Sequence, residues 1–400
     1  MPLPLKQILL AGPDDAALAM SAKAGRQNGL GWVVSTVYSG NEALTLLDQA
    51  SFDLVIASMV LPGMSGLDLL RATMVRHPHT VRVLLLDRPE PNLMLGSVGI
   101  AHQYLVKPCA ADDLLLTVCR LLALDQFFTG DPLRRVVARI QQLPSPPTIY
   151  FRLMQELARP DATTEKVGEI ISQDASLTAK LLQLANSAFF ALPRPVVSVP
   201  EAVQIIGFNL VKSLSLSLGL FASLNSEAIG EYSSDRLYLH SLATGLLAQR
   251  ILSDEGAESA IVDAAFTAGV LHDTGKLVLA SALPELYQHA LQLASDELIP
   301  QWQAEANVFG VSHAEIGAYL LGLWGLPPSI VEAVAWHHQP RRHEPPALGV
   351  LAAVHIADYL QNRHLPASRR PLVVQIDEPY IQSLHLIDRI GQWEEAAGRL

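Results

Sequence analysis

The periodicity of the apolar residues changes near residues 124–143, and this change indicates two regions with different secondary structure. Before it, short apolar runs alternate with helical patterns, and after it helical patterns continue to the end. The runs cover residues 8–11, 33–38, 54–57, 81–86 and 103–106. Strands that are apolar on both faces and separated by helices predict an α/β region with a doubly wound parallel sheet of five strands, followed by an all-α region.

Charge and composition exclude several classes of protein. The 400 residues include 28 Lys and Arg against 39 Asp and Glu, a formal net charge of −11 that disfavours nonspecific binding to nucleic acid. Because 50% of the residues are hydrophobic and only 17% are charged, we expect a globular protein with sizeable cores. Cys109 and Cys119 are not spaced as a disulfide framework or a zinc site. Without a secretory signal or an apolar stretch of about 20 residues, a cytoplasmic protein with no membrane span is expected.

Two segments of the first region follow the pattern of a known domain. Residues Asp53–Gly66 and Ala101–Pro108 resemble the receiver (CheY-like) domain of bacterial two-component response regulators almost position by position. The resemblance implies that residues 1–124 form a receiver-like domain of the kind used in a phosphorelay. In that family an aspartate is phosphorylated, and two acidic residues after the first strand help to hold Mg²⁺, which prefers oxygen ligands.

Most of the chemically active positions of the receiver pattern are replaced in this chain. The phosphoacceptor position is Ser58, and the acidic pair is replaced by Gly12 and Pro13. The hydroxyl residue that normally ends the fourth strand corresponds to Leu86, so Lys107 is the only intact member of the set. We therefore expect a pseudo-receiver that is not phosphorylated, holds no Mg²⁺, and acts by binding partners or by regulating its neighbour.

Asp14 and Asp15 follow the replaced acidic pair and allow two interpretations. They are candidates for displaced metal ligands, or they are the N-cap and first-turn acid of the following helix, where such residues are favoured. Tyr104 similarly resembles the switch aromatic residue of receiver domains, or is a tyrosine partly buried in a sheet.

Residues 125–143 are predicted to form a helical connector between the two regions. Asp131 and Pro132 suit the start of this helix, and prolines at 144, 146 and 147 suit its end. Its apolar face consists of Leu133, Val136, Val137, Ile140 and Leu143. Such a face packs within the chain or against a second copy of itself, which would give a homodimer, and in either case the helix can transmit a signal.

Three segments of the second region follow another known pattern. They are Leu143–Pro147, Ile171–Ser187 and Val199–Gly207, and they resemble the HDOD module, an HD-related output domain of bacterial signalling proteins. The resemblance covers residues 139–340. It implies an all-α fold of the HD superfamily, a regulatory or scaffolding role, and other signalling proteins as partners. Residues 341–400 are expected to form a C-terminal helical extension that packs on this domain.

Histidines and aspartates in the second region follow the order of an HD-type metal site. The set consists of His240, His272, Asp273, His313, His337, His338 and Asp358. Each lies in a segment predicted as helix with apolar neighbours, so helix packing would gather them as it does in bundle sites. Imidazoles together with carboxylates suit Mn, Fe or Zn better than Mg or Ca. The same residues are also compatible with buried His–Asp pairs that hold no ion.

The sequence leaves three functions open. A metal-dependent phosphohydrolase or phosphodiesterase, acting on a cyclic dinucleotide or another nucleotide, would use Asp273 and Lys276 as candidate catalytic residues. Lys276, four residues after His272, would share its helical face and bind a phosphate, or be a surface lysine. However, the related HD-GYP phosphodiesterases carry a Gly-Tyr-Pro element that is missing after His338, and Arg236 stands where they have an acidic ligand. We therefore favour a noncatalytic regulator that acts through protein contacts, or a nucleotide sensor without turnover.

Overall fold

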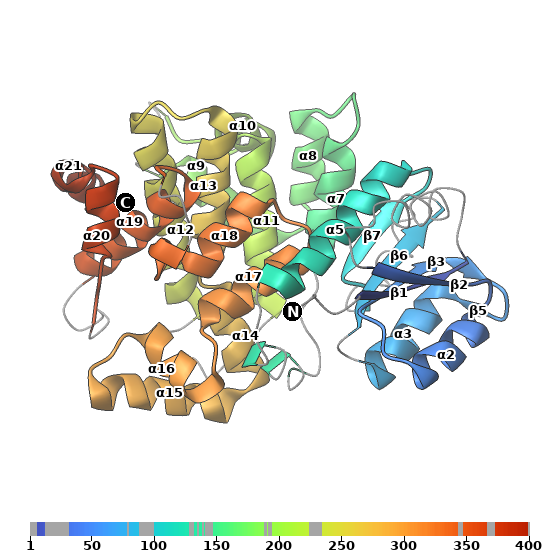
Figure 1. The fold of residues 1–400 in the computed structure, drawn as a ribbon. Helices are drawn as coiled ribbons and strands as arrows, with labels where there is room; N and C mark the ends of the chain where they lie inside the picture. Colours follow the sequence, from blue (N-terminus) through green and yellow to red (C-terminus); the bar gives the residue numbers. More distant parts are fainter. Residues whose placement is uncertain are drawn as a thin grey trace. The chain divides into compact units, whose positions relative to one another are not determined.

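The structure is a computed structural model of the chain (Figure 1). It describes residues 6–12, 32–77, 80–87, 100–127, 132–133, 136–137, 140, 147–187, 190, 194–223, 234–342, 347–365 and 373–398. The chain divides into two compact units, one formed mainly by residues 1–145 and the other mainly by residues 146–400.

The first unit contains a five-stranded parallel sheet in the order β2-β1-β3-β6-β7. Its strands are β1 (Lys6–Ala11), β2 (Trp32–Val37), β3 (Leu54–Ser58), β6 (Val81–Leu86) and β7 (Gln103–Val106). All residues of β3 and β6 are buried, as expected for central strands covered on both faces, whereas the edge strand β2 is partly exposed. The predicted doubly wound sheet of five strands is confirmed.

Helices cover both sides of this sheet, with α2 and α3 on one side and α5 on the other (Figure 1). They are α2 (Gly40–Gln49), α3 (Gly66–Arg76) and α5 (Ala111–Phe127). Ser39 and Ser65 cap the first two by accepting hydrogen bonds from backbone N–H groups three residues later. A short antiparallel hairpin of β4 (Val60–Leu61) and β5 (Met64–Ser65) follows β3, and the sequence pattern did not indicate it.

Helices are the regular elements of the second unit within its described residues, which confirms the predicted all-α region. Its first helices are α7 (Thr148–Leu157), α8 (Thr164–Ile171), α9 (Ala175–Ala185), α10 (Val199–Ile206), α11 (Phe208–Ser223), α12 (Ser234–Asp254), α13 (Ser259–Leu271) and α14 (Thr274–Ala282). The others are α15 (Pro284–Glu297), α16 (Gln301–Phe309), α17 (His313–Leu323), α18 (Pro328–Trp336), η2 (Pro340–Arg342), α19 (Val350–His364), α20 (Glu378–Ser383) and α21 (Ile387–Ala397). Asp174 accepts a hydrogen bond from the Leu177 backbone and caps α9, as its position in the sequence predicts.

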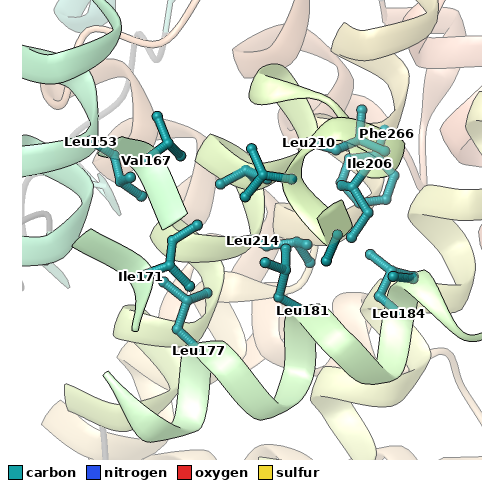
Figure 2. Close-up of a cluster of buried hydrophobic side chains, with 14 of the residues drawn as sticks. Leu153, Val167, Ile171, Leu177, Leu181, Leu184, Ile206, Leu210, Leu214 and Phe266 are labelled. Atoms are coloured by element: carbon teal, nitrogen blue, oxygen red, sulfur yellow. The ribbon is translucent and has the colours of Figure 1, made fainter. Parts of the chain in front are cut away.

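One hydrophobic core joins the first helices of this unit (Figure 2). Its buried side chains include Leu153, Val167, Ile171, Leu177, Leu181, Leu184, Ile206, Leu210, Leu214 and Phe266. Phe266 belongs to α13, which also packs against α12, α18 and α19. Because α13 takes part in both sets of contacts, the core supports the helices that carry the histidines and aspartates described below.

The predicted connector is only partly described. Leu133, Val136 and Ile140 are buried, whereas Leu143 lies outside the described residues. Neither Cys109 nor Cys119 forms a disulfide. Within the described ranges no single helix is long and apolar enough to cross a membrane, although α10 and α11, which meet at a 109° bend, pass the length and composition test as a pair.

Candidate metal centre

The seven histidines and aspartates of the predicted metal set come from five helices and the turns that follow them. His240 lies within α12 and Asp358 within α19. The prediction that every member lies inside a helix is wrong for His272, Asp273 and His337, because α13 ends at Leu271, α14 begins at Thr274 and α18 ends at Trp336. His338 also follows the end of α18, and His313 is the first residue of α17. Apolar periodicity continues across these short breaks, so it does not reveal them.

The carboxylate of Asp273 lies at the centre of four imidazoles. Its Oδ1 is 3.2 Å from Nε2 of His313 and 4.0 Å from Nε2 of His337. Its Oδ2 is 3.3 Å from Nε2 of His272 and 4.0 Å from Nε2 of His240. The structure therefore brings together residues that lie up to 97 positions from one another, from His240 to His337 (337 − 240 = 97).

Asp358 gives the cluster a second carboxylate. Its Oδ1 is 3.0 Å from Nε2 of His240 and 3.6 Å from Nε2 of His272, and its Oδ2 is 3.9 Å from Nδ1 of His338. His338 also lies 3.1 Å from His313, between the two Nε2 atoms. All seven predicted residues thus belong to one connected cluster.

Three of the imidazoles are oriented by hydrogen bonds at Nδ1. His272 donates to the backbone oxygen of Gly269 at 2.7 Å, and His337 donates to that of Val334 at 2.8 Å. His313 Nδ1 lies 2.5 Å from the Glu305 carboxylate. With the proton at Nδ1, the lone pair at Nε2 points into the cluster, which is the arrangement that metal-binding histidines adopt.

Buried atoms in the cluster lack hydrogen-bond partners within the part of the chain that the structure describes. They are Nε2 of His272, Nε2 of His337 and Oδ1 of Asp273. Leaving such atoms unpaired costs about 1–3 kcal/mol each unless a ligand satisfies them. These orphaned ligand atoms fit a metal ion.

The ligand atoms are close enough for more than one cation. Within the described residues, three groups of three side chains offer ligand atoms that lie within 4.8 Å of one another. One group is His313, His337 and His338, another is His240, His272 and Asp273, and a third is His272, His337 and Asp358. The first two groups share no residue, so the described side chains offer two separate sets of ligands.

Without a metal, the two carboxylates of the cluster are balanced by positive charge on His272 and Lys276. Burial by itself lowers the pKa of His272, but the carboxylates of Asp273 and Asp358 raise it to about 10. Burial and the nearby His272 lower the pKa of His337 to about 3. Although burial opposes this, His272 and Lys276 hold the pKa of Asp273 well below its ordinary value. The aspartates are therefore ionised, and a divalent cation would supply the charge that a proton on His272 otherwise provides.

Lys276 occupies neither of the two places that the sequence suggested. The helix breaks at Asp273, so Lys276 does not share a helical face with His272, and it is not a surface lysine, since its side chain is only 18% exposed. Its Nζ lies 2.7 Å from Oδ2 of Asp273. Lys276 therefore fixes the central carboxylate and at the same time borders the cavity described next.

A cavity of about 880 Å³ opens over the cluster. Members of the metal set line part of it. The rest of the lining includes apolar side chains and six that are positively charged or aromatic: Arg236, Lys276, Trp302, Arg341, Arg342 and Tyr359. The ring of Trp302 is stacked on His338 with centroids 6.1 Å apart. The volume falls in the range of sites for small ligands, and the lining suits a ligand with phosphate groups and an aromatic part.

Glu305 and His355 belong to the site although no sequence pattern pointed to them. Glu305 is fully buried in α16, where its Oε2 accepts the backbone N–H of His313 at 2.7 Å in addition to its contact with that imidazole. His355 is 3% exposed in α19 and donates from Nδ1 to the backbone oxygen of His337 at 2.6 Å. In the sequence, each is a polar residue inside a helix with apolar neighbours. That pattern indicates burial, but it does not show which residue the side chain contacts.

The sheet edge of the first unit, where the receiver pattern places its chemistry, is built differently. Ser58 donates to the backbone oxygen of Gly12, and Lys107 donates to Ser58 Oγ at 3.3 Å. Lys107 also forms an ion pair of 3.1 Å with Asp87, which the sequence reasoning missed because it considered Leu86 at the end of the strand. Leu86 itself is buried. Asp87 thus supplies a carboxylate at this edge, and it faces the lysine.

An apolar side chain fills the space beside the replaced acidic pair. Gly12 has a φ of +63°, and a Cβ built on it would lie 2.2 Å from Cδ2 of Leu61. Any other side chain at this position would be strained and would displace Leu61. Pro13, Asp14 and Asp15 lie outside the described residues.

Comparison with known proteins identifies both regions. The model of the response regulator receiver domain matches residues 8–119, and the model of the HDOD domain matches residues 143–340. The chain carries a receiver domain followed by an HDOD domain. This combination supports a role in signal transduction.

Individual proteins and solved structures are similar to parts of this chain. A crystal structure of an HDOD domain protein of unknown function from Geobacter sulfurreducens is 26% identical, with a TM-score of 0.51, and covers 66% of this chain and 96% of its own. An uncharacterized protein of Treponema pallidum is 28% identical over 214 residues, which are 52% of this chain and 41% of that protein. The DNA-binding response regulator MtrA of Mycobacterium tuberculosis is 25% identical over 39% of this chain and 72% of its own.

Proposed function

We propose that the HDOD domain of this regulator binds two divalent transition-metal ions and hydrolyses a phosphate ester, while its receiver domain acts only through protein contacts. One observation carries the first part: three imidazoles fixed at Nδ1 direct Nε2 toward two buried carboxylates. His313, His337 and His338 would hold one ion, and His240, His272 and Asp273 the other. Asp358 would complete the site. The mixture of nitrogen and oxygen ligands favours Mn, Fe or Zn.

Divalent ions in such a site act as Lewis acids toward phosphoryl oxygens and make a nucleophile available at neutral pH. The chain's own residues would bind and orient the ester. Lys276, which borders the cavity beside Asp273, can donate to a phosphoryl oxygen. Trp302, stacked on His338, offers a flat surface to a nucleobase, and Arg236 at the cavity wall offers charge to a further phosphate. These features support a nucleotide or cyclic dinucleotide as the substrate.

Metal analysis and a hydrolysis assay test this proposal together. The full chain, purified without chelator, should contain about two equivalents of transition metal and hydrolyse bis(p-nitrophenyl) phosphate or a cyclic dinucleotide. The double variant His272→Ala, Asp273→Ala should lose the metal and more than about 100-fold in rate, because it removes the central ligands. His289→Ala, at an exposed histidine on α15, is the matched control and should behave as the unmodified chain. A chain without stoichiometric metal would refute the proposal.

A nucleotide sensor without turnover is the second candidate. Arg236 favours this candidate. It lies one helical turn before His240 and lines the cavity. The HD-GYP phosphodiesterases have an acidic ligand at the corresponding position. Binding of a cyclic dinucleotide with metal present, at a hydrolysis rate equal to that of the double variant, would support the sensor against the enzyme.

The proposed role of the receiver domain rests on its sheet edge. The hydrogen-bond partners described for Ser58 Oγ are the Gly12 backbone oxygen and Lys107, and that lysine is itself paired with Asp87, so neither partner is a carboxylate that would act as a base or hold Mg²⁺. Other signalling proteins, or a second copy of this chain, are the partners that such a domain would contact. A pull-down with the full chain and with a variant lacking residues 1–124 would separate receiver-dependent partners from the others.

A further inference from the structure

His355 joins the metal cluster to the wall of the cavity through two hydrogen bonds. It lies on α19, three residues before Asp358, and is 3% exposed. Its Nδ1 donates to the backbone oxygen of His337 at 2.6 Å. Its Nε2 accepts the backbone N–H of Asp377 at 3.0 Å. One donor and one acceptor are the capacity of a neutral imidazole, so both ring nitrogens are in use.

Each of these bonds satisfies a backbone group at the end of a helix. His337 follows the last residue of α18, where carbonyl groups have no partner within the helix. Asp377 is the N-cap of α20, and its side-chain Oδ1 accepts the N–H of Tyr380 at 3.1 Å. His355 therefore joins the end of one helix, which carries two members of the metal set, to the start of another, which carries none.

Asp377 extends this connection to the cavity. Its Oδ2 accepts a hydrogen bond of 2.8 Å from Nε of Arg341, and both residues line the cavity. The ring of Tyr380 meets the His355 ring edge to face, with centroids 6.1 Å apart. A ligand that moves Arg341 or the segment 373–379 would act on His355, and through it on His337.

We propose that His355 is a positioning residue that couples metal occupancy of the cluster to the cavity wall formed by residues 373–379. The metal part of this inference rests on the proposed function. His355 touches neither metal nor substrate in this role. It fixes the backbone of His337 and transmits displacement of that backbone to Asp377.

Two substitutions test the two hydrogen bonds of His355 separately, because each keeps one bond and removes the other. In His355→Asn the side-chain amide reaches the place of Nδ1 and keeps a donor for the His337 oxygen. In His355→Gln the amide oxygen reaches the place of Nε2 and keeps an acceptor for the Asp377 N–H. Both variants keep a polar side chain of similar size, so that loss of folding is avoided, and His289→Asn is the control.

Amide hydrogen exchange and Mn²⁺ titration of the full chain provide the test. Without metal, exchange at the Asp377 amide should be at least about 10-fold faster in His355→Asn than in the unmodified chain, and near the unmodified rate in His355→Gln. Affinity for Mn²⁺ should fall about 10-fold or more in His355→Gln and change little in His355→Asn, as second-sphere losses of metal affinity are about 10–100-fold. Mn²⁺ should slow exchange at Asp377 in the unmodified chain and in neither variant.

Equal slowing of Asp377 exchange by Mn²⁺ in all three proteins would overturn the proposed coupling. Unchanged exchange in metal-free His355→Asn would overturn the bond on which it depends. If the unmodified chain bound no Mn²⁺, the proposed hydrolysis would fail, and the metal-free comparison would still decide whether His355 holds Asp377.

Discussion

The receiver domain and the HDOD domain both gather polar side chains at the ends of secondary-structure elements, but those side chains are used differently. At the sheet edge, Ser58 donates to Gly12 and Lys107 bonds to Ser58 and Asp87. In the helical cluster, Nε2 of His272, Nε2 of His337 and Oδ1 of Asp273 are buried and have no hydrogen-bond partner among the described residues. Polar residues that satisfy one another stabilise a fold, whereas a cluster that leaves ligand atoms unpaired has the composition of a binding site.

The difference also shows in how the two sites are packed. Beside Gly12, the side chain of Leu61 occupies the space that any larger residue would need. Above the cluster, a cavity of about 880 Å³ remains open to a ligand. The chain itself fills the space at the sheet edge, whereas the cluster leaves room for a ligand.

The largest effect is expected where the cluster depends on close packing. Gly275 lies between Asp273 and Lys276, and a Cβ at this position would lie 1.9 Å from the backbone oxygen of His313. Because a backbone atom cannot move aside locally, Gly275→Ala should lower the free energy of unfolding by about 2–3 kcal/mol and displace α17. Chemical denaturation of the full chain measures this.

Gly391→Ala is the matched control for that substitution, since nothing lies within 4 Å of its Cβ position in α21. This variant should be unchanged or up to about 1 kcal/mol more stable. Equal stabilities of the two variants would show that α14 and α17 are not in the close contact described. That contact would then not fix the positions of Asp273 and His313.

An intermediate effect is expected at the carboxylate that orients His313. Glu305→Gln removes the charge and leaves one amide oxygen for two N–H groups that now share Oε2. We expect affinity for Mn²⁺ or Zn²⁺ to fall about 10–100-fold, with the fold intact. Metal titration followed by circular dichroism measures both, and Glu285→Gln on the exposed face of α15 is the control. Unchanged affinity would mean that His313 is not a ligand.

No effect is expected at the sheet edge. Acetyl phosphate or beryllium fluoride with Mg²⁺ should leave the mass and the oligomeric state of the chain unchanged, because Ser58 bonds to a backbone oxygen and to Lys107, and the Asp87 carboxylate at this edge is paired with that lysine. Ser58→Asp alone should remain unmodified for the same reason. Intact-mass and peptide-mass spectrometry measure this, and a gain of one phosphate on the peptide containing residue 58 would remove the contrast between the two domains.

Local pattern predicted the elements of the fold well, and it predicted the members of the cluster through their order along the chain. The five parallel strands and the all-α region followed from apolar periodicity, which depends on neighbouring residues. Glu305 and His355 could not be found in this way, because their roles arise from contacts with residues 8 and 18 positions away, respectively. The break at Asp273 and the pairing of Lys107 with Asp87 depend on tertiary packing as well.

The position of Asp358 on α19 has a practical meaning for anyone who dissects this molecule. The family resemblance stops at residue 340, yet one of the two carboxylates of the cluster comes from the helix after it. A fragment cut where the sequence family ends would carry six of the seven side chains and lack the carboxylate that lies 3.0 Å from Nε2 of His240. The residues of the cluster therefore extend beyond the part of the chain that the family model matches. An assay that finds no activity in the shorter fragment would not show that the full chain is inactive.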